Sequence, residues 1–287
     1  MNAMTKSLPI PEAARAAGMT RLVFADDFDS YDTIDLSGKG RPGYLWYADR
    51  PYGFPTLTRE ELVLRDSVLH MEPEVCGSAI GLCSFSRAGA CGFAMHYGYA
   101  EARIRASMPT GPYNGVPAFW GISQRDFMDG VWEHCGELDI LEINVAGDGM
   151  IYTGTLHDHY RSGRTRPDGT REQTAATNLV NALGYGRADF LDDGWHTYAA
   201  LWEPGHVAWY LDGVEMHSAR YRVGALPEYY YRDDPRPLPR IEASKPELAG
   251  RTWPGAHHIM EMENEVIILG CNKHWPMDVD WVRIWQA

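Results

Sequence analysis

Short strand-length runs of apolar and β-branched residues, separated by turn residues, follow one another from Arg21 to the end of this 287-residue chain. Long amphipathic helices are absent, and no internal repeat interrupts the pattern. Asp212-Gly213, between two such runs, is suited to a type I′ turn and predicts a β-hairpin. The expected strands are residues 22–24, 61–64, 67–71, 99–105, 118–122, 150–157, 196–202, 207–211 and 279–285. The sequence therefore predicts an all-β fold, a β-jelly-roll sandwich of two packed antiparallel sheets.

Two stretches have no strand pattern, residues 158–194 and residues 223–258. The second contains six prolines and cannot form a central strand. Loops of this length in a compact domain usually form functional walls or lids. No break in composition marks a domain boundary, so we expect a single domain over residues 22–287. Residues 1–21 are expected to form an N-terminal extension with a short helix, which begins near Pro11 and ends at Gly18.

Composition excludes several classes of function. The formal net charge of −13 argues against a phosphate-binding surface, so we expect no nucleic-acid partner. No run approaches the roughly 20 consecutive apolar residues that cross a bilayer, so we expect no membrane partner either. The five cysteines form no CxxC pair and are expected to be small buried hydrophobes. Residues 1–18 lack the continuous apolar core of a secretory signal, and the sequence leaves the compartment open.

Three acids stand among aliphatic residues at Glu137, Asp139 and Glu142. On a regular strand the two-residue period places Glu137 and Asp139 on one face and Glu142 on the other, inside the hydrophobic layer. A β-bulge at Ile140-Leu141 would shift the phase by one residue and bring all three acids to one face. The sequence therefore predicts a bulge at these two residues.

Neighbouring carboxylates repel one another, and this repulsion favours a state in which one of them is protonated and neutral. Retaining glycosidases use this division, with a carboxylate nucleophile and a carboxylic acid about 5–5.5 Å apart. A solvated strand face and a calcium site are alternative interpretations of the three acids. The acids by themselves favour neither the catalytic interpretation nor these alternatives.

The acid motif resembles the E-x-D-x-x-E signature of glycoside hydrolase family 16, in the bulged branch that includes laminarinases, agarases, porphyranases and carrageenases. Trp132, five residues before Glu137, is similar to the tryptophan of the family's W-x-x-x-G-E run. Further similar motifs occur in the family's order at residues 22–29, 97–105, 117–120, 155–157, 195–198, 202, 209–213 and 277–286. Together they cover most of residues 22–157 and 195–286.

The resemblance implies a jelly roll with a concave substrate cleft and an endo-acting, retaining hydrolase of a β-linked polysaccharide. By position, Glu137 is the implied nucleophile, Asp139 its assistant and Glu142 the general acid/base. No cofactor is required for such catalysis. We expect a polysaccharide as the partner and a monomeric protein, and the family implies an extracellular or periplasmic location.

Four further residues are candidates for substrate binding, each with a structural alternative. Trp132 is a candidate sugar platform, because a flat ring stacks on the apolar face of a pyranose, or else a core residue. Trp120 belongs either to the cleft or to the interior. His157 is a candidate partner of Asp139 or of the sugar, or a structural histidine. Arg103 shares a strand face with Arg105, and one of them is a candidate contact to the acids, although a solvated pair is the favoured interpretation.

The resemblance also implies a possible structural calcium on the convex side, bound partly by Asp280. Asp27 and Asp29 are further candidate ligands if the first and last strands pair, and calcium needs six or more oxygen atoms.

The substrate is less defined than the reaction class. Residues 44–54 differ from the corresponding segment of β-1,3-glucanases, and Val116 stands before Pro117 where the family often has tryptophan. β-1,3-Glucan is the first expectation, and a galactan or an acidic exopolysaccharide is the alternative. The basic loop with Arg161, Arg164, Arg166 and Arg171 is a candidate contact to an acidic polysaccharide, or a solvated loop. A lectin-like carbohydrate-binding protein without catalysis is an alternative of another class.

Overall fold

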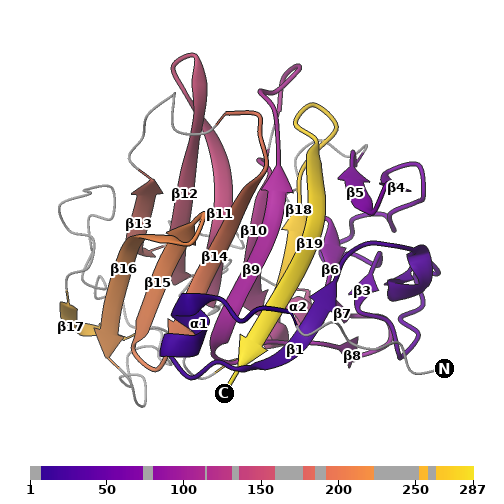
Figure 1. Ribbon diagram of the computed structural model, residues 1–287. Coiled ribbons are helices and arrows are strands. Elements are labelled where there is room, and N and C mark those ends of the chain that lie inside the picture. The colour runs from indigo at the N-terminus through magenta and orange to yellow at the C-terminus, as the bar shows by residue number, and fades with distance from the viewer. Residues whose placement is uncertain are drawn as a thin grey trace, which may run out of the picture.

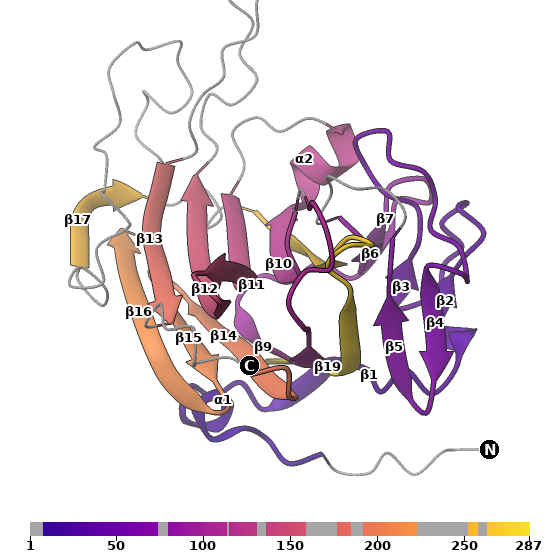
Figure 2. The ribbon, with the colours of Figure 1, turned by 90° about the horizontal axis from the view of Figure 1, so that it is seen from above.

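The computed structural model describes residues 8–73, 80–113, 115–130, 136–158, 177–184, 192–222, 252–257 and 263–287. Two large sheets lie face to face across a shared hydrophobic core, and both sheets are curved (Figures 1 and 2). Within the described residues nearly all strand pairs are antiparallel, as the strand pattern predicts. None of the helices in this part of the chain has the length and apolar content needed to span a membrane.

The first sheet, here called sheet A, contains both the first and the last strand of the chain. Its strands are β1 (Arg21–Asp26), β4 (Leu62–Arg65), β5 (Val68–Met71), β9 (Gly98–Arg105), β14 (His196–Glu203), β15 (His206–Leu211), β16 (Val214–Arg222), β17 (Thr252–His257) and β19 (Met277–Gln286). They lie in the order β17-β16-β15-β14-β9-β19-β5-β4, and β1 also pairs with β19. The first and last strands of the chain therefore lie side by side.

The second sheet, sheet B, has the order β13-β12-β11-β10-β18-β6-β3-β2. These strands are β2 (Ile34–Asp35), β3 (Trp46–Tyr47), β6 (Leu82–Cys83), β10 (Ala118–Ser123), β11 (Gly136–Ala146), β12 (Gly149–Asp158), β13 (Thr177–Gly184) and β18 (Glu265–Gly270). A small separate hairpin pairs β7 (Phe85–Ser86) with β8 (Cys91–Gly92). The helical elements are α1 (Glu12–Ala16), the 3-10 helix η1 (Tyr31–Thr33) and α2 (Gln124–Asp129).

Alternation along the strands builds the core between the sheets. On β9, Ala100, Ala102 and Ile104 are buried in that core, whereas Arg103 and Arg105 form ion pairs on the other face of sheet A. Buried aromatic rings fill much of the space between the sheets, among them Trp46, Trp202, Trp209, Trp275, Tyr152 and Tyr198.

The two short α-helices lie on opposite sides of the molecule (Figure 2). The helix α1 covers sheet A, where Ala14 and Met19 pack with Tyr99 and Trp285. Its chain turns at Gly18, whose φ of +75° a glycine adopts without strain. The helix α2 follows β10 directly and packs Phe127 against sheet B. The short helix expected near Pro11 is thus confirmed.

All nine expected strands are present, and the differences occur at strands that the pattern does not mark. At the predicted hairpin, Asp212 and Gly213 have φ of +50° and +78°, as a type I′ turn requires. The strands β13 and β17 lie inside stretches expected to be irregular, so that expectation is wrong there. Both are outermost strands, and β17 carries Pro254 at an edge, where a missing N–H is tolerated.

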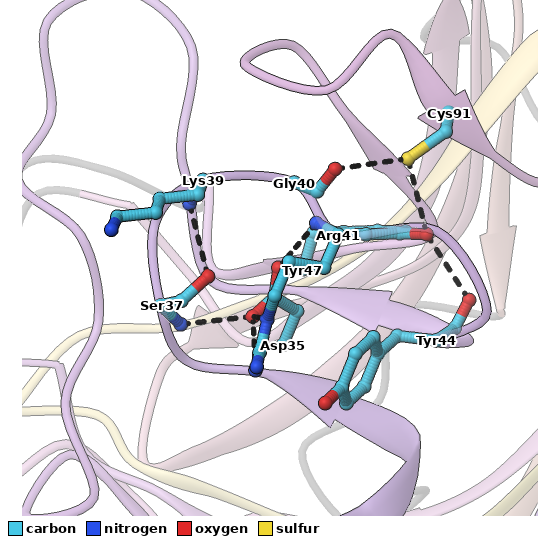
Figure 3. Close-up of polar contacts among 8 residues, drawn as sticks. All are labelled: Asp35, Ser37, Lys39, Gly40, Arg41, Tyr44, Tyr47 and Cys91. Atoms are coloured by element: carbon cyan, nitrogen blue, oxygen red, sulfur yellow. Dashed lines mark hydrogen bonds and ion pairs between the residues drawn. The ribbon is translucent and has the colours of Figure 1, made fainter.

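A buried carboxylate anchors the loop that follows β2 (Figure 3). One oxygen of Asp35 accepts hydrogen bonds from the Ser37 amide at 3.0 Å and the Arg41 guanidinium at 3.0 and 3.1 Å. The other oxygen accepts the Arg41 amide at 2.7 Å. Burial raises the pKa of Asp35, but the hydrogen bonds from Ser37 and Arg41 outweigh it and lower that pKa to about 2. Asp35 is therefore ionised at neutral pH.

Candidate active site

The predicted bulge is present on β11. Asp139 pairs with Thr155 of β12 and Glu142 with Thr153, so Ile140 and Leu141 together oppose the single residue between those threonines. Two residues opposite one define a β-bulge. Ile140 and Leu141 are fully buried in the core between the sheets, as the hydrophobic layer demands.

The register shows that the three acids share one face. Across β10, Glu137 lies beside Ile122, Asp139 beside Trp120 and Glu142 beside Ala118. These partners are two residues apart, and partners spaced in this way lie on the same face of a strand. The partners on β12 have the same spacing, at His157, Thr155 and Thr153. We call this side of sheet B, which points away from sheet A, the acid face.

The acids differ in exposure. Asp139 is buried, with 3% of its surface exposed, whereas Glu137 and Glu142 are partly exposed. The two outer carboxylates are thus accessible to a ligand, and the central one is covered. The face thus carries two partly exposed carboxyl groups with a buried third between them.

The acid face is apolar on one flank and polar on the other. On the β10 flank a hydrophobic cluster covers the sheet, made of Ile80, Cys83, Phe85, Ala118, Trp120, Ile122, Phe127, Val266 and Ile268. On the β12 flank, the neighbours are Thr153 and Thr155. The register aligns the acids with the boundary between these two surfaces.

Trp120 lies on the acid face but is 3% exposed, because it belongs to this hydrophobic cluster. Trp120 is expected either in the cleft or in the interior. It lies on the side of the sheet that carries the acids, but neighbouring side chains cover it. It supports the acid strand from the side instead of offering an open platform for a sugar.

A fourth acid, which the motif does not include, lies on β18. Glu265 is fully buried and pairs in register with Ser123 at the end of β10. Burial raises the pKa of Glu265 well above its ordinary value, and the charges of Glu263, Glu137 and Asp139 raise it further. These surroundings favour the neutral form of the Glu265 carboxyl group. Its only sequence signal is an acid at the start of an apolar run.

Trp132 lies outside the described residues, as does the basic loop with Arg161, Arg164, Arg166 and Arg171. The backbone of His157 is described, and it pairs with Glu137 across the β11–β12 ladder. The backbone thus places His157 opposite Glu137, whereas the partner of Asp139 on this strand is Thr155.

Arg103 is not part of this site. It lies on β9 of sheet A, forms an ion pair with Asp280 and stacks over the Trp195 ring at 5.0 Å. The expectation that it contacts the acids is wrong, because alternation along β9 directs Ala102 and Ile104 into the core and the arginines to the opposite face. The favoured alternative, a solvated pair, describes Arg103 and Arg105 better.

The implied calcium ligands have other partners in the described part of the chain. Asp280 pairs with Arg103, and Asp27 with Arg283 at 2.8 Å. Asp29 accepts a hydrogen bond from Ser67 at 2.7 Å. No cluster of three or more His, Cys, Asp or Glu side chains suited to a metal ion occurs among the described residues. Among the described residues, the side chains of Asp27, Asp29 and Asp280 therefore do not form one shared carboxylate cluster.

Comparisons with known proteins agree with this geometry. The chain is 24% identical over 298 residues to the keratan-sulfate endo-1,4-beta-galactosidase of Sphingobacterium multivorum, with 97% of this chain and 61% of that protein covered. It is 30% identical over 121 residues to glucan endo-1,3-beta-glucosidase A1 of Niallia circulans, with 40% and 15% covered. The chain thus spans less than two thirds of the length of either relative.

The fold resembles that of a solved enzyme. The catalytic domain of an endo-1,3-beta-glucanase (laminarinase) from Thermotoga petrophila RKU-1 matches with a TM-score of 0.50 and 18% identity, over 93% of this chain and 97% of that domain. The expected jelly-roll sandwich is therefore confirmed. The family model of glycosyl hydrolases family 16 matches residues 79–261, which is more than half of the chain and includes all three acids. The chain belongs to glycosyl hydrolases family 16.

Proposed function

We propose that this protein is a retaining endo-β-glycosidase that hydrolyses a polysaccharide. The observation that carries the proposal is the bulge of β11, which places Glu137, Asp139 and Glu142 on one face with the outer two accessible. Two accessible carboxyl groups flanking a scissile bond are what hydrolysis with retention requires. Family membership supports the same reaction class.

In the proposed first step Glu142, protonated, donates its proton to the glycosidic oxygen as the bond to the anomeric carbon breaks. The Glu137 carboxylate attacks that carbon from the opposite side and forms a covalent glycosyl-enzyme. In the second step the Glu142 carboxylate takes a proton from water, and the resulting nucleophile displaces Glu137. Both carboxyl groups return to their starting states, so carboxyl groups and water suffice and no cofactor takes part.

Asp139 is proposed to support Glu137. Its buried carboxyl group lies between the two outer acids and shares their face. A proton held among neighbouring carboxyl groups lowers their mutual repulsion and leaves the nucleophile charged while the acid stays protonated.

Two substrates are proposed. β-1,3-Glucan is the first, since the aligned relative of Niallia circulans is named for that linkage. A β-galactan is the second, and one observation favours it: the relative that aligns along 97% of this chain is named an endo-β-galactosidase. The two differ in the sugar that occupies the acid face, and the chemistry on Glu137 and Glu142 is the same for both.

A reducing-end assay on laminarin, lichenan, agarose, carrageenan, keratan sulfate and acidic bacterial polysaccharides tests the proposal. We expect the wild type to cleave one of these chains internally. Glu137→Gln should abolish turnover, with a loss of at least about 10³-fold, because the nucleophile is removed. Folding and polysaccharide binding should be unchanged, as thermal unfolding and affinity electrophoresis will show. Binding without turnover by the wild type on every chain would contradict the proposal and favour the lectin.

A further inference from the structure

Two backbone carbonyl groups at the bulge of β11 accept hydrogen bonds from side chains outside the β11–β12 ladder. They belong to Asp139 and Ile140, where the pairing with β12 shifts. Both residues are buried, so their carbonyl groups are satisfied by donors of the protein and not by water. A bulge in the middle of a buried sheet therefore needs its own donors.

Trp209 supplies the first donor from the opposite sheet. It lies on β15 of sheet A, is fully buried, and its indole Nε1–H donates to the Asp139 carbonyl at 2.8 Å. The ring fits because position 154 on β12, between the two threonines that flank the bulge, is glycine. A Cβ atom at Gly154 would lie 2.4 Å from Cδ1 and 2.6 Å from Nε1 of Trp209. The glycine and the indole thus form a matched pair beneath the acids.

Tyr152 supplies the second donor from the neighbouring strand. Its hydroxyl donates to the Ile140 carbonyl at 3.1 Å, and the ring is fully buried. Burial raises the pKa of Tyr152 well above its ordinary value, so the hydroxyl remains a donor over the whole working pH range. Each carbonyl of the bulge thus has one aromatic donor.

These contacts affect the chemistry because the bulge determines which face of β11 each later side chain occupies. If β11 lost its bulge and became a regular ladder, every residue after Ile140 would change face, and Glu142 would point into the core. Glu137 precedes the bulge and would keep its orientation. The bulge therefore controls where the second acid lies relative to the first.

We propose that Trp209 and Tyr152 are positioning residues, which hold the bulge of β11 and thereby aim the Glu142 carboxyl group at the glycosidic oxygen. This inference rests on the proposed function. Neither residue touches the substrate, since both lie between the sheets, and both act through the backbone of Asp139 and Ile140.

The test compares Trp209→Phe, Tyr152→Phe and the double variant with Trp275→Phe as matched control. Trp275 is a fully buried member of the same core, and its indole N–H has no hydrogen-bond partner among the described residues. The control therefore makes the same change in ring size without removing a donor from the bulge. Tyr152→Phe removes a single oxygen atom and preserves a folded variant for the comparison even if Trp209→Phe does not fold.

Two substrates distinguish a displaced Glu142 carboxyl group from a general loss of active-site structure. Cleavage of the polysaccharide needs a proton from Glu142, whereas the first step on a 2,4-dinitrophenyl β-glycoside of the same sugar does not, because that leaving group departs as the anion. We expect kcat on the polysaccharide to fall about 10-fold to 100-fold in the Trp209 and Tyr152 variants. The rate constant of the pre-steady-state burst on the aryl glycoside, which reports the first step, should change less than about 3-fold. Azide should raise the steady-state turnover of the aryl glycoside by these variants, because it replaces the water that Glu142 activates in the second step.

Equal losses on both substrates, or wild-type kcat in Tyr152→Phe and Trp209→Phe, would overturn the positioning role and leave the proposed function intact. A loss in Trp275→Phe as large as that in Trp209→Phe would overturn it too. A wild type without activity on any polysaccharide or aryl glycoside would instead overturn the proposed function, and the positioning role with it.

Discussion

Replacing Glu101 by glutamine removes a buried carboxyl group from the outer side of sheet A. Glu101 lies on β9 and is 8% exposed. Burial raises its pKa to about 7, although Arg283 and the Tyr99 hydroxyl favour the charged form. The folded protein therefore holds a proton on Glu101 that the unfolded chain releases at lower pH.

The sign and size of the effect follow from this difference. The pKa of Glu101 is about 7 in the folded protein and about 4.5 in the unfolded chain, and this gap corresponds to about 3 kcal/mol. Because the folded pKa is the higher one, the free energy of unfolding falls as pH rises from about 4.5 through about 7 and is constant above that. Glu101→Gln mimics the protonated form and should lose this dependence.

Urea unfolding followed by tryptophan fluorescence at several values between pH 5 and pH 8 measures the effect. Between these limits the wild type should lose about 2–3 kcal/mol more stability than Glu101→Gln. Glu12→Gln, at an exposed position on α1, controls for the loss of one negative charge. Parallel pH profiles of wild type and Glu101→Gln would refute the reasoning, because they would show that Glu101 has the same pKa in both states.

Two further substitutions test other parts of the fold. Asp35→Asn should lower the free energy of unfolding at pH 7 by about 1–2 kcal/mol, less than its pKa of about 2 alone implies because Arg41 is half exposed. The difference should disappear in denaturation curves taken as pH falls from about 4 towards 2, where the wild-type carboxylate takes up its proton, and a difference that persists at low pH would contradict it. Gly154→Ala should lower stability by about 1–3 kcal/mol and reduce polysaccharide turnover, since its Cβ atom forces the Trp209 ring away from Asp139. Wild-type melting temperature and turnover in this variant would contradict the contact.

The sequence predicts the sandwich because alternation and turn residues mark most of its strands. It does not predict β18, whose six residues are buried without alternation because both faces of that strand are covered. It also does not predict β13 and β17, which pair only at the edges of the two sheets. Edge strands need less regular patterns than central ones, so proline and polar residues conceal them.

The site divides in the same way. The bulge is predictable because a regular strand would place Glu142 on the core face with Leu138 and Ile140, and the structure confirms that prediction. The contact of Trp209 with Asp139 joins residues 70 positions apart on opposite sheets, and no local pattern indicates it. Alternation shows that Arg103 and Arg105 share a face, but the side of the sandwich is fixed only when β9 is placed between β14 and β19.

The central claim is that Glu137 is a nucleophile which the bulge places on one face with Glu142. Mass spectrometry of peptides after incubation with an activated 2-deoxy-2-fluoro glycoside tests it most directly, because the fluorine slows hydrolysis and traps the covalent intermediate. The account predicts one sugar attached to the Glu137 side chain, and no adduct in Glu137→Gln. A sugar attached to any other residue, or an enzyme that turns over its polysaccharide without ever forming an adduct, would contradict the account.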